Sequence, residues 1–200
     1  ANDVLKGFLS YNEKFKGDAG NDSIDGGSGN DSLDGGDGND SLSGGNENDT
    51  LLGGSGNDTL DGGSGYNTLS GGQGNDTLTA SYYWSSDTYL FNLGDGQDVI
   101  TDYGNSGYQD ILRFGAGITA ADLTFSRLNQ DMQITIGTQG DQITVKNWFT
   151  NAEYFIERFE FVDGTVLNST QVIERSTYQG TGANDVLKGF LSYNEKFKGD

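Results

Sequence analysis

Residues 17–79 carry one aliphatic side chain in every nine positions, set among Gly, Asn, Asp and Ser. These positions are Ile24, Leu33, Leu42, Leu51, Leu60, Leu69 and Leu78. Between glycine-rich turns only short stretches such as Ser32–Asp34 are left to run straight, which predicts strands of about three residues. One apolar residue in nine cannot form a core alone, but stacked turns can align these residues as the inner ladder of a solenoid.

The period comes from a nine-residue phrase that is written seven times without a gap. Its copies start at Gly17, Gly26, Gly35, Gly44, Gly53, Gly62 and Gly71. The clearest copy is Gly26–Asp34, GGSGNDSLD, and position six is always Asp except at Asn67. The phrase resembles the calcium-binding nonapeptide repeat of the RTX, or haemolysin-type, family.

The resemblance implies an all-β fold, in which a parallel β-roll (a right-handed solenoid of nonapeptides) is followed by a β-rich capping domain. In such a roll two nonapeptides form one coil, so residues eighteen positions apart lie above one another. One edge would carry Asp22, Asp40, Asp58 and Asp76, and the other would carry Asp31, Asp49 and Asn67.

Carboxylates stacked this closely repel one another, and residues 17–79 contain no Lys or Arg. Calcium suits such a site because it takes about six to eight oxygen ligands in a flexible geometry, whereas magnesium demands a stricter octahedron. The chain has no Cys or His, so zinc and copper lack their usual ligands. The alternative, that Asn-Asp-Gly clusters only form turns, does not explain the fixed register. We predict several Ca²⁺ ions as cofactors.

The predicted ligands are carboxylates and, by resemblance, turn carbonyls. The carboxylates are Asp22, Asp31, Asp40, Asp49, Asp58 and Asp76, extended by Asp3, Glu13 and Asp87 in neighbouring coils. The glycines are Gly27, Gly29, Gly36, Gly38, Gly45, Gly54, Gly56 and Gly63. Asn67 is a neutral ligand, which predicts a weak site, and Glu47 replaces a turn glycine, which predicts a strained turn. The Asn at position five, such as Asn21, is expected to hydrogen-bond its own turn or to adopt a left-handed conformation.

The chain divides into four segments. Residues 1–16 are degenerate N-terminal capping repeats, 17–79 are the roll, 80–182 are a β-rich flanking and capping domain, and 183–200 start a next unit. Residues 183–200 repeat residues 1–18 letter for letter. We interpret the chain as a fragment of a protein built from tandem units, and an engineered duplication is the alternative.

Residues 80–182 are rich in aromatic side chains, and their hydrophobic alternation predicts strands. The predicted strands are Thr88–Leu93, Asp98–Asp102, Asp110–Phe114, Leu123–Leu128, Met132–Ile136, Gln142–Lys146 and Ile156–Val162. Hairpin turns are predicted at 129–131 and 138–141, a helical turn at 147–154, and a short helix through Arg175 that Ser169 and Thr170 cap.

The opening of this region resembles the segment that follows haemolysin-type repeats. The stretch Gly94–Tyr103, GDGQDVITDY, carries the resemblance, which implies that the region covers the open end of the roll. Within this stretch Asp95, Asp98 and Asp102 are either turn formers or ligands of another Ca²⁺.

Composition limits the possible functions. The net charge of −19 argues against nucleic acid and anionic membranes as partners. Without His or Cys there is no Ser-His-Asp triad, Cys-His pair or HExxH zinc site, so we expect no enzyme and no catalytic residues. No apolar run approaches a membrane span, and no signal peptide is visible at the start. Because free Ca²⁺ is scarce inside cells, and because the resemblance implies type I secretion, we expect a secreted protein or one on the bacterial cell surface.

Two functions remain. The first is a calcium-binding structural module of an exported toxin, adhesin or surface protein, unfolded during export and folded by calcium outside the cell. Its partners are calcium and the neighbouring tandem units. The alternative is a module that binds carbohydrate or a host receptor. In that case Trp84, Trp148 and tyrosines would form a stacking surface, although their use in core packing is the competing interpretation.

Overall fold

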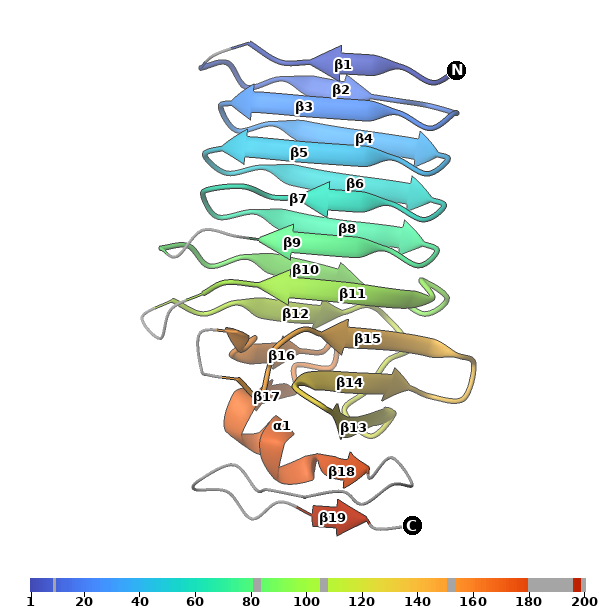
Figure 1. The fold of residues 1–200 in the computed structure, drawn as a ribbon, viewed down its shortest axis with the longest axis vertical. Coiled ribbons are helices and arrows are strands. Elements are labelled where there is room, and N and C mark those ends of the chain that lie inside the picture. The colour runs from blue at the N-terminus through green and yellow to red at the C-terminus, as the bar shows by residue number, and fades with distance from the viewer. Residues whose placement is uncertain (9, 81–83, 105–107, 151–153, 180–195, 199–200) are drawn as a thin grey trace.

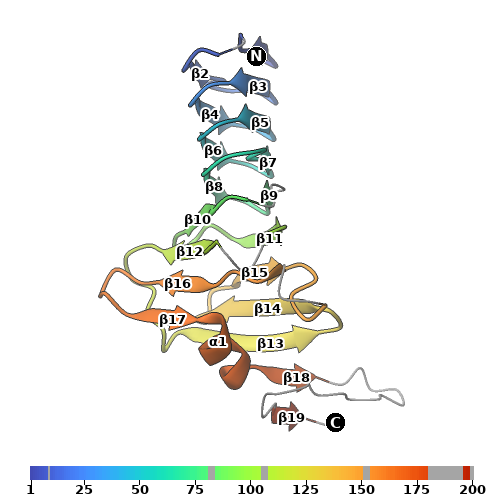
Figure 2. The ribbon, with the colours of Figure 1, turned by 90° about the vertical axis from the view of Figure 1, so that its left-hand side faces the viewer.

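The structure is a computed structural model that describes residues 1–200 except 9, 81–83, 105–107, 151–153, 180–195 and 199–200. Two sheets face each other, and through the roll the chain passes from one sheet to the other at every turn (Figure 1). Turned by 90°, the molecule is a narrow column that widens at its C-terminal end (Figure 2).

The first sheet contains the odd-numbered strands of the roll and the C-terminal hairpins. Its described strands are β1 (Val4–Lys6), β3 (Ser23–Ser28), β5 (Ser41–Asn46), β7 (Thr59–Asp61), β9 (Thr77–Ala80), β11 (Gln97–Asp102), β13 (Leu123–Leu128), β14 (Asp131–Ile136), β15 (Asp141–Val145), β18 (Thr177–Gln179) and β19 (Lys196–Lys198). They are arranged in the order β1-β3-β5-β7-β9-β11-β15-β14-β13-β18-β19.

The second sheet contains the even-numbered strands of the roll and two later strands. Its described strands are β2 (Lys14–Lys16), β4 (Ser32–Asp37), β6 (Thr50–Ser55), β8 (Thr68–Gln73), β10 (Thr88–Phe91), β12 (Ile111–Phe114), β16 (Arg158–Glu160) and β17 (Val166–Asn168). They are arranged in the order β17-β16-β12-β10-β8-β6-β4-β2. The short helix α1 (Ser169–Arg175) follows β17.

Parallel pairing fixes the length of one coil. Leu33 in β4 pairs with Leu51 in β6, which pairs with Leu69 in β8, so partners are eighteen residues apart. The predicted coil of two nonapeptides, and with it the parallel β-roll, is confirmed. The strands are longer than predicted, because β4 runs through its glycine pair and Gly36 still pairs with Gly54 of the next coil.

The aliphatic ladder forms the interior of the roll. All seven predicted residues are at most 2% exposed, and they belong to one hydrophobic cluster with the aromatic side chains of the C-terminal part. Burying one such side chain contributes roughly 2 kcal/mol. One residue from each half-coil therefore suffices only because every coil lies between two others.

The C-terminal part continues the two sheets of the roll. β10 pairs with β8 and β11 pairs with β9, both in parallel. The predicted hairpins are confirmed, since β13 and β14 pair antiparallel and β14 and β15 do so as well. The hydrophobic core is continuous across residue 80. The boundary predicted there therefore marks a change in the type of sequence, within one continuous stack of coils.

Several details of this part differ from the sequence predictions. The strand predicted at 88–93 ends at Phe91. Of the range predicted at 156–162, only the three residues of β16 form a strand. The strands β17 and β18 are not predicted from the sequence. Three-residue strands give too few alternations to be recognised. The helical turn predicted at 147–154 lies partly outside the described residues, as does most of 183–200.

The cap of α1 was predicted one residue too late. Asn168, not Ser169, is the N-cap: its side chain accepts from the Gln171 N–H, and the Gln171 side chain accepts from the Asn168 N–H. This reciprocal pair is a capping box, in which Asn serves as well as Ser.

Candidate metal centre

The position-six acids form one column at each edge of the roll. In the first column the N–H of Asp22 donates to Oδ1 of Asp40 at 2.7 Å, and Asp40 and Asp58 repeat this bond to the next coil. In the second, the N–H of Asp31 donates to Oδ1 of Asp49 at 2.8 Å. Each carboxylate therefore uses one oxygen to bind the backbone of the coil before it.

The second oxygen of each acid has no partner. Among the described residues, the buried oxygens without a hydrogen bond include Oδ2 of Asp22, Asp31, Asp40, Asp49, Asp58 and Asp76 and Oε2 of Glu13. Burying an unpaired carboxylate is costly, so native proteins pair such groups or bind a metal with them. The sequence predicted all of these acids, and the structure brings them into the two expected columns.

Glycine at position one makes room for the free oxygen. A Cβ built on Gly26 would lie 2.6 Å from Oδ2 of Asp31 and 2.8 Å from the carbonyl oxygen of Gly44 in the next coil. The backbone of Gly26 does not have a positive φ, so glycine is required here for space and not for conformation. Sequence reasoning missed this role. The signal was present, because position one is Gly in every copy.

The same space recurs along both edges. The position-one glycines whose Cβ would meet the free acid oxygen of their own turn are Gly7, Gly17, Gly26, Gly35, Gly44, Gly53 and Gly71. In all but Gly71, the Cβ would also meet a carbonyl oxygen of the next coil. A small cradle lined by oxygens, next to a buried carboxylate, is therefore a repeated feature of the roll.

This donor set fits calcium. No three His, Cys, Asp or Glu side chains of the described residues converge as a metal cluster, so any ion here would need backbone carbonyls beside its carboxylates. Calcium accepts such mixed oxygen ligands at flexible spacing. The predicted carbonyl glycines lie in these turns, and all eight have a positive φ.

Burial strongly affects the ionisation of the columns. It raises the pKa of Asp49 to about 7 and that of Asp58 to about 6, and the carboxylate of the preceding coil adds to each effect. The pKa of Asp76 also rises to about 6 for the same reasons. Near neutral pH the roll thus holds acids whose charged form is unfavourable without a cation.

Three of the predicted ligands differ from this arrangement. Asn67 places Nδ2 where the acids place Oδ2, and this nitrogen donates to the carbonyl of Gly65. Asp87 continues the column, but its Oδ2 accepts from the Ser85 hydroxyl at 3.0 Å. Asp3 stacks on Asp22 through its N–H, but it is exposed in the terminal coil. None of the three provides a buried oxygen without a partner.

Position four contains the expected strain. Glu47 replaces glycine there and adopts φ of 71°, a conformation that favours glycine. Its Oε2 accepts the N–H of Gly29 at 2.7 Å, which gives the substitution a compensating contact.

The position-five asparagines also form columns, separate from those of the position-six acids. The expectation that they bond within their own turn is wrong: Oδ1 of Asn21 accepts the N–H of Asn39 at 3.0 Å, and Asn39 does the same for Asn57. None of the three has a positive φ. The coil repeat places the next backbone N–H directly beside each amide, so the closest partner is eighteen residues away.

The two tryptophans have different environments. Trp148 is fully buried and stacks on Phe155 with centroids 4.9 Å apart. Trp84 is 60% exposed and meets Tyr108 edge-on at 6.4 Å. Only Trp84 is therefore available to a ligand at the surface.

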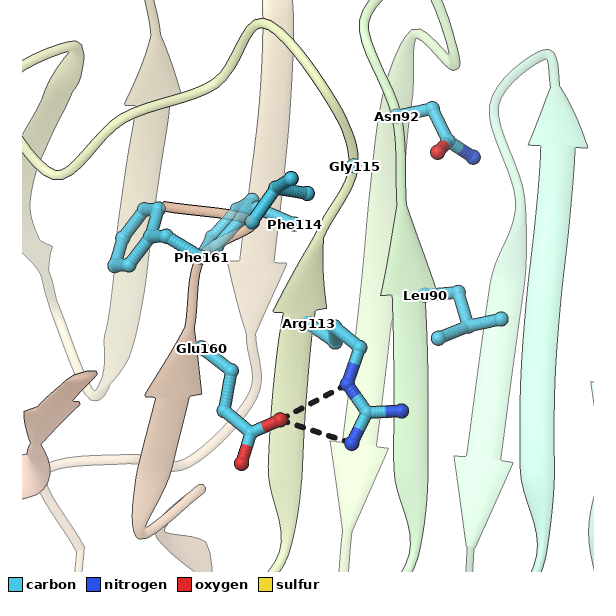
Figure 3. A pocket seen from close by; sticks show the side chains of 8 residues that line it. Leu90, Asn92, Arg113, Phe114, Gly115, Glu160 and Phe161 are labelled. Carbon is cyan, nitrogen blue, oxygen red and sulfur yellow. Dashed lines mark hydrogen bonds and ion pairs between the residues drawn. The ribbon is translucent and has the colours of Figure 1, made fainter. Parts of the chain in front are cut away.

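A hollow of about 270 Å³ lies where the second sheet passes from the roll to the C-terminal part (Figure 3). Leu90, Phe114 and Phe161 line it, and the ion pair of Arg113 and Glu160 at 2.8 Å crosses one side. The aromatic side chains that line the hollow are Phe114 and Phe161, and both are buried. No Trp or Tyr ring of the described residues lines it, and exposed rings of these residues are what a sugar-stacking site requires.

A parallel β-roll with buried carboxylate columns at its edges defines a class: repeat proteins built to bind cations. The RTX calcium-binding nonapeptide repeat matches residues 9–42 and 43–78, and the haemolysin-type calcium binding protein related domain matches 131–171. The chain belongs to the RTX family. Such repeat proteins are typically exported.

Individual relatives are longer than this chain. The iron-regulated protein FrpA of Neisseria meningitidis serogroup C is 43% identical over 109 residues, which are 52% of this chain and 10% of FrpA. The extracellular lipase LipA of Serratia marcescens matches with a TM-score of 0.31 and 18% identity, covering 70% of this chain and 37% of LipA. No helix in the described part of the chain is long and apolar enough to cross a membrane.

Proposed function

We propose that this chain is a calcium-binding structural module of an exported RTX protein, and that calcium outside the cell folds it. The observation that carries the proposal is the column of buried acid oxygens without partners at each edge of the roll. Without a cation these oxygens repel one another and remain unpaired. Binding of Ca²⁺ to the folded state alone would stabilise that state by mass action.

The predicted ligand roles follow from the columns. The acids of the six regular turns, with Glu13, supply the carboxylate oxygens, and the positive-φ glycines of the same turns supply carbonyl oxygens. Asn67, Asp87 and Asp3 contribute less: Asn67 has a nitrogen in place of the free oxygen, the free oxygen of Asp87 is already bonded to Ser85, and Asp3 is exposed. The module has no catalytic role in this proposal; any such role belongs to other parts of a longer protein.

A calcium titration of chelator-treated protein tests the proposal. We expect far-ultraviolet circular dichroism to change steeply from coil to β structure with Ca²⁺, and to change little with Mg²⁺ at the same concentration. A spectrum that is already rich in β structure without metal, and that Ca²⁺ does not alter, would overturn the proposed folding switch.

The second candidate function is recognition of a carbohydrate or a host receptor. The exposed ring of Trp84, next to Tyr108, is the observation that favours it. A glycan array with the calcium-loaded protein tests this candidate, and Trp84→Ala is expected to abolish any specific signal. Retention of the signal in this variant would exclude Trp84 as the contact.

A further inference from the structure

The acid column on one edge continues beyond the nonapeptides. The N–H of Asp87 donates to Oδ1 of Asp110 at 2.7 Å, and the N–H of Asp110 donates to Oε2 of Glu157 at 2.9 Å. Asp110 thus has the place in its turn that Asp31 and Asp49 have in theirs. Insertions between these acids hide the continuation from a search for a nine-residue period.

The register identifies the residue at position one of this last turn. Asp61, directly before Gly62, pairs with Thr79, and Ala80 pairs with Asp102. Gly62, Ala80 and Asp102 therefore have the same place in three successive turns. The position that must be glycine in the repeats is an aspartate at the start of the β11–β12 turn.

This substitution has a direct steric meaning. In the repeats, a Cβ at position one would enter the cradle beside the free carboxylate oxygen, as at Gly26 and Asp31. A side chain rooted at Asp102 starts from that cradle. Its carboxylate is thus placed beside Asp110, within the same turn.

Both side chains have an oxygen without a partner. Asp102 and Asp110 are each 1% exposed, and among the described residues Oδ2 of each lacks a hydrogen-bond donor from any other group. The two carboxyl groups lie within hydrogen-bonding reach of each other, so a shared proton or a cation is needed between them. Neither carboxylate takes part in an ion pair of the described residues. Burial raises the pKa of Asp102, and the neighbouring charge of Asp110 raises it further.

The neighbouring groups do not supply the missing cation. Glu157 and Asp87 are themselves acidic, and Oδ2 of Asp87 is bonded to Ser85. The hydroxyl of Tyr89 is buried without a partner and can only add a neutral oxygen. The local chemistry is that of a hard-cation site: two buried carboxylates, further oxygens and no positive side chain among the groups named.

We propose that Asp102 and Asp110 together bind one further calcium ion in the β11–β12 turn, outside the nonapeptide repeats. The site rests on the calcium chemistry proposed for the roll, but it uses two carboxylates of one turn in place of one carboxylate and a position-one glycine. Backbone carbonyls and water complete the coordination, because no third acidic side chain of the described residues converges there. Such an ion joins the roll to its C-terminal continuation.

Counting bound ions in the whole chain tests the proposal. Native mass spectrometry in low-micromolar Ca²⁺ is expected to show one ion fewer for Asp102→Ala, which copies Ala80 of the preceding turn, than for the unaltered protein. Asp110→Asn is expected to lose the same ion, while its amide oxygen still accepts the N–H of Asp87, as the amide oxygen of Asn67 accepts the N–H of Asp49 one coil earlier. Asp61→Asn is the matched control: it removes one exposed negative charge and should leave the count unchanged.

The outcomes separate the two proposals. If both variants bind as many ions as the unaltered protein, the Asp102 site is refuted, and a shared proton satisfies the two oxygens instead. If the unaltered protein binds no calcium at all, the proposed function fails. Circular dichroism in excess calcium checks folding, and a variant that folds while losing one ion supports the site.

Discussion

The roll and its C-terminal continuation share two sheets but stabilise them differently. Inside the roll each half-coil contributes one aliphatic residue, whereas the continuation is filled by stacked rings such as Phe114 and Phe161, 4.9 Å apart. The roll buries acids without counter-charges. The continuation pairs some of its acids with its own cations, as Asp131 does with Lys146 at 2.5 Å.

This difference shows where each region obtains its stability. A chain that pairs its own charges and buries large rings needs no solute to fold. A chain that stacks unpaired carboxylates depends on an ion from solution, and its stability follows the concentration of that ion. The same strand pairing therefore produces a roll whose stability depends on the ion concentration and a C-terminal part whose stability depends on it less.

Removal of calcium should have the largest effect and should separate the two regions. In excess chelator at pH 7.5, backbone amides of residues 23–73 are expected to lose most of their protection from hydrogen exchange. Amides of the β13–β14–β15 hairpins should retain more, because these strands bury large apolar side chains such as Phe125, Ile134 and Ile143, which need no ion. Equal loss in both regions would contradict the comparison.

Acidification should partly replace calcium in the roll. Because burial raises the pKa of Asp49 to about 7 and of Asp58 to about 6, the folded state holds these protons more tightly than the unfolded state. In chelator this contribution to stability is therefore fully present only below the unfolded pKa of 3.8, and it is lost as the pH rises from there through about 6 to 7.

Circular dichroism at a series of pH values measures this change. The same series in excess calcium is the control, where the trend should reverse because protons compete with calcium for the carboxylates. Identical profiles with and without calcium would show that the columns do not bind the ion.

Closing one cradle should cost less than losing all ions. Gly35→Ala places a Cβ against Asp40 and the carbonyl of Gly53. We expect a destabilisation of about 1–3 kcal/mol from overpacking, together with the loss of an ion. Thermal unfolding and native mass spectrometry measure the two effects.

Gly164→Ala, in the C-terminal part, provides the contrast. This glycine has φ of 85° and open space around its Cβ position. The variant should lose only about 1 kcal/mol of stability, because alanine is disfavoured in this backbone conformation, and it should keep every ion. A change in its ion count would show that the assay responds to stability rather than to the cradle.

Restoring a missing carboxylate should have the smallest effect. Asn67→Asp puts an oxygen where Nδ2 now lies, beside Gly62, and should lower the calcium midpoint of folding or add one ion. Asn57→Asp is the matched control, since it adds the same charge on the exposed asparagine column. If both variants shift the midpoint equally, only net charge matters and position six has no special role.

Much of the roll could be predicted because its information is local and repeated. The nonapeptide period, with the resemblance to RTX repeats, predicted the coil, the aliphatic ladder and both acid columns, which Glu13 and Asp87 were expected to extend in neighbouring coils. In the C-terminal part the alternation gave β13 to the residue. The strands β17 and β18 were not predicted, because three residues are too few to show a period.

The sequence by itself determined the nine-residue period and the acid in almost every repeat, and its resemblance to RTX repeats implied coils of eighteen residues with acids at both edges. Only the tertiary structure decided which oxygens remain free. That choice depends on contacts between coils: the backbone N–H that occupies each Oδ1, the Ser85 hydroxyl that satisfies Asp87, and the space that position-one glycines leave. The pairing of Asp102 with Ala80, across a gap of twenty-two residues, is likewise set by strand register and not by any local pattern.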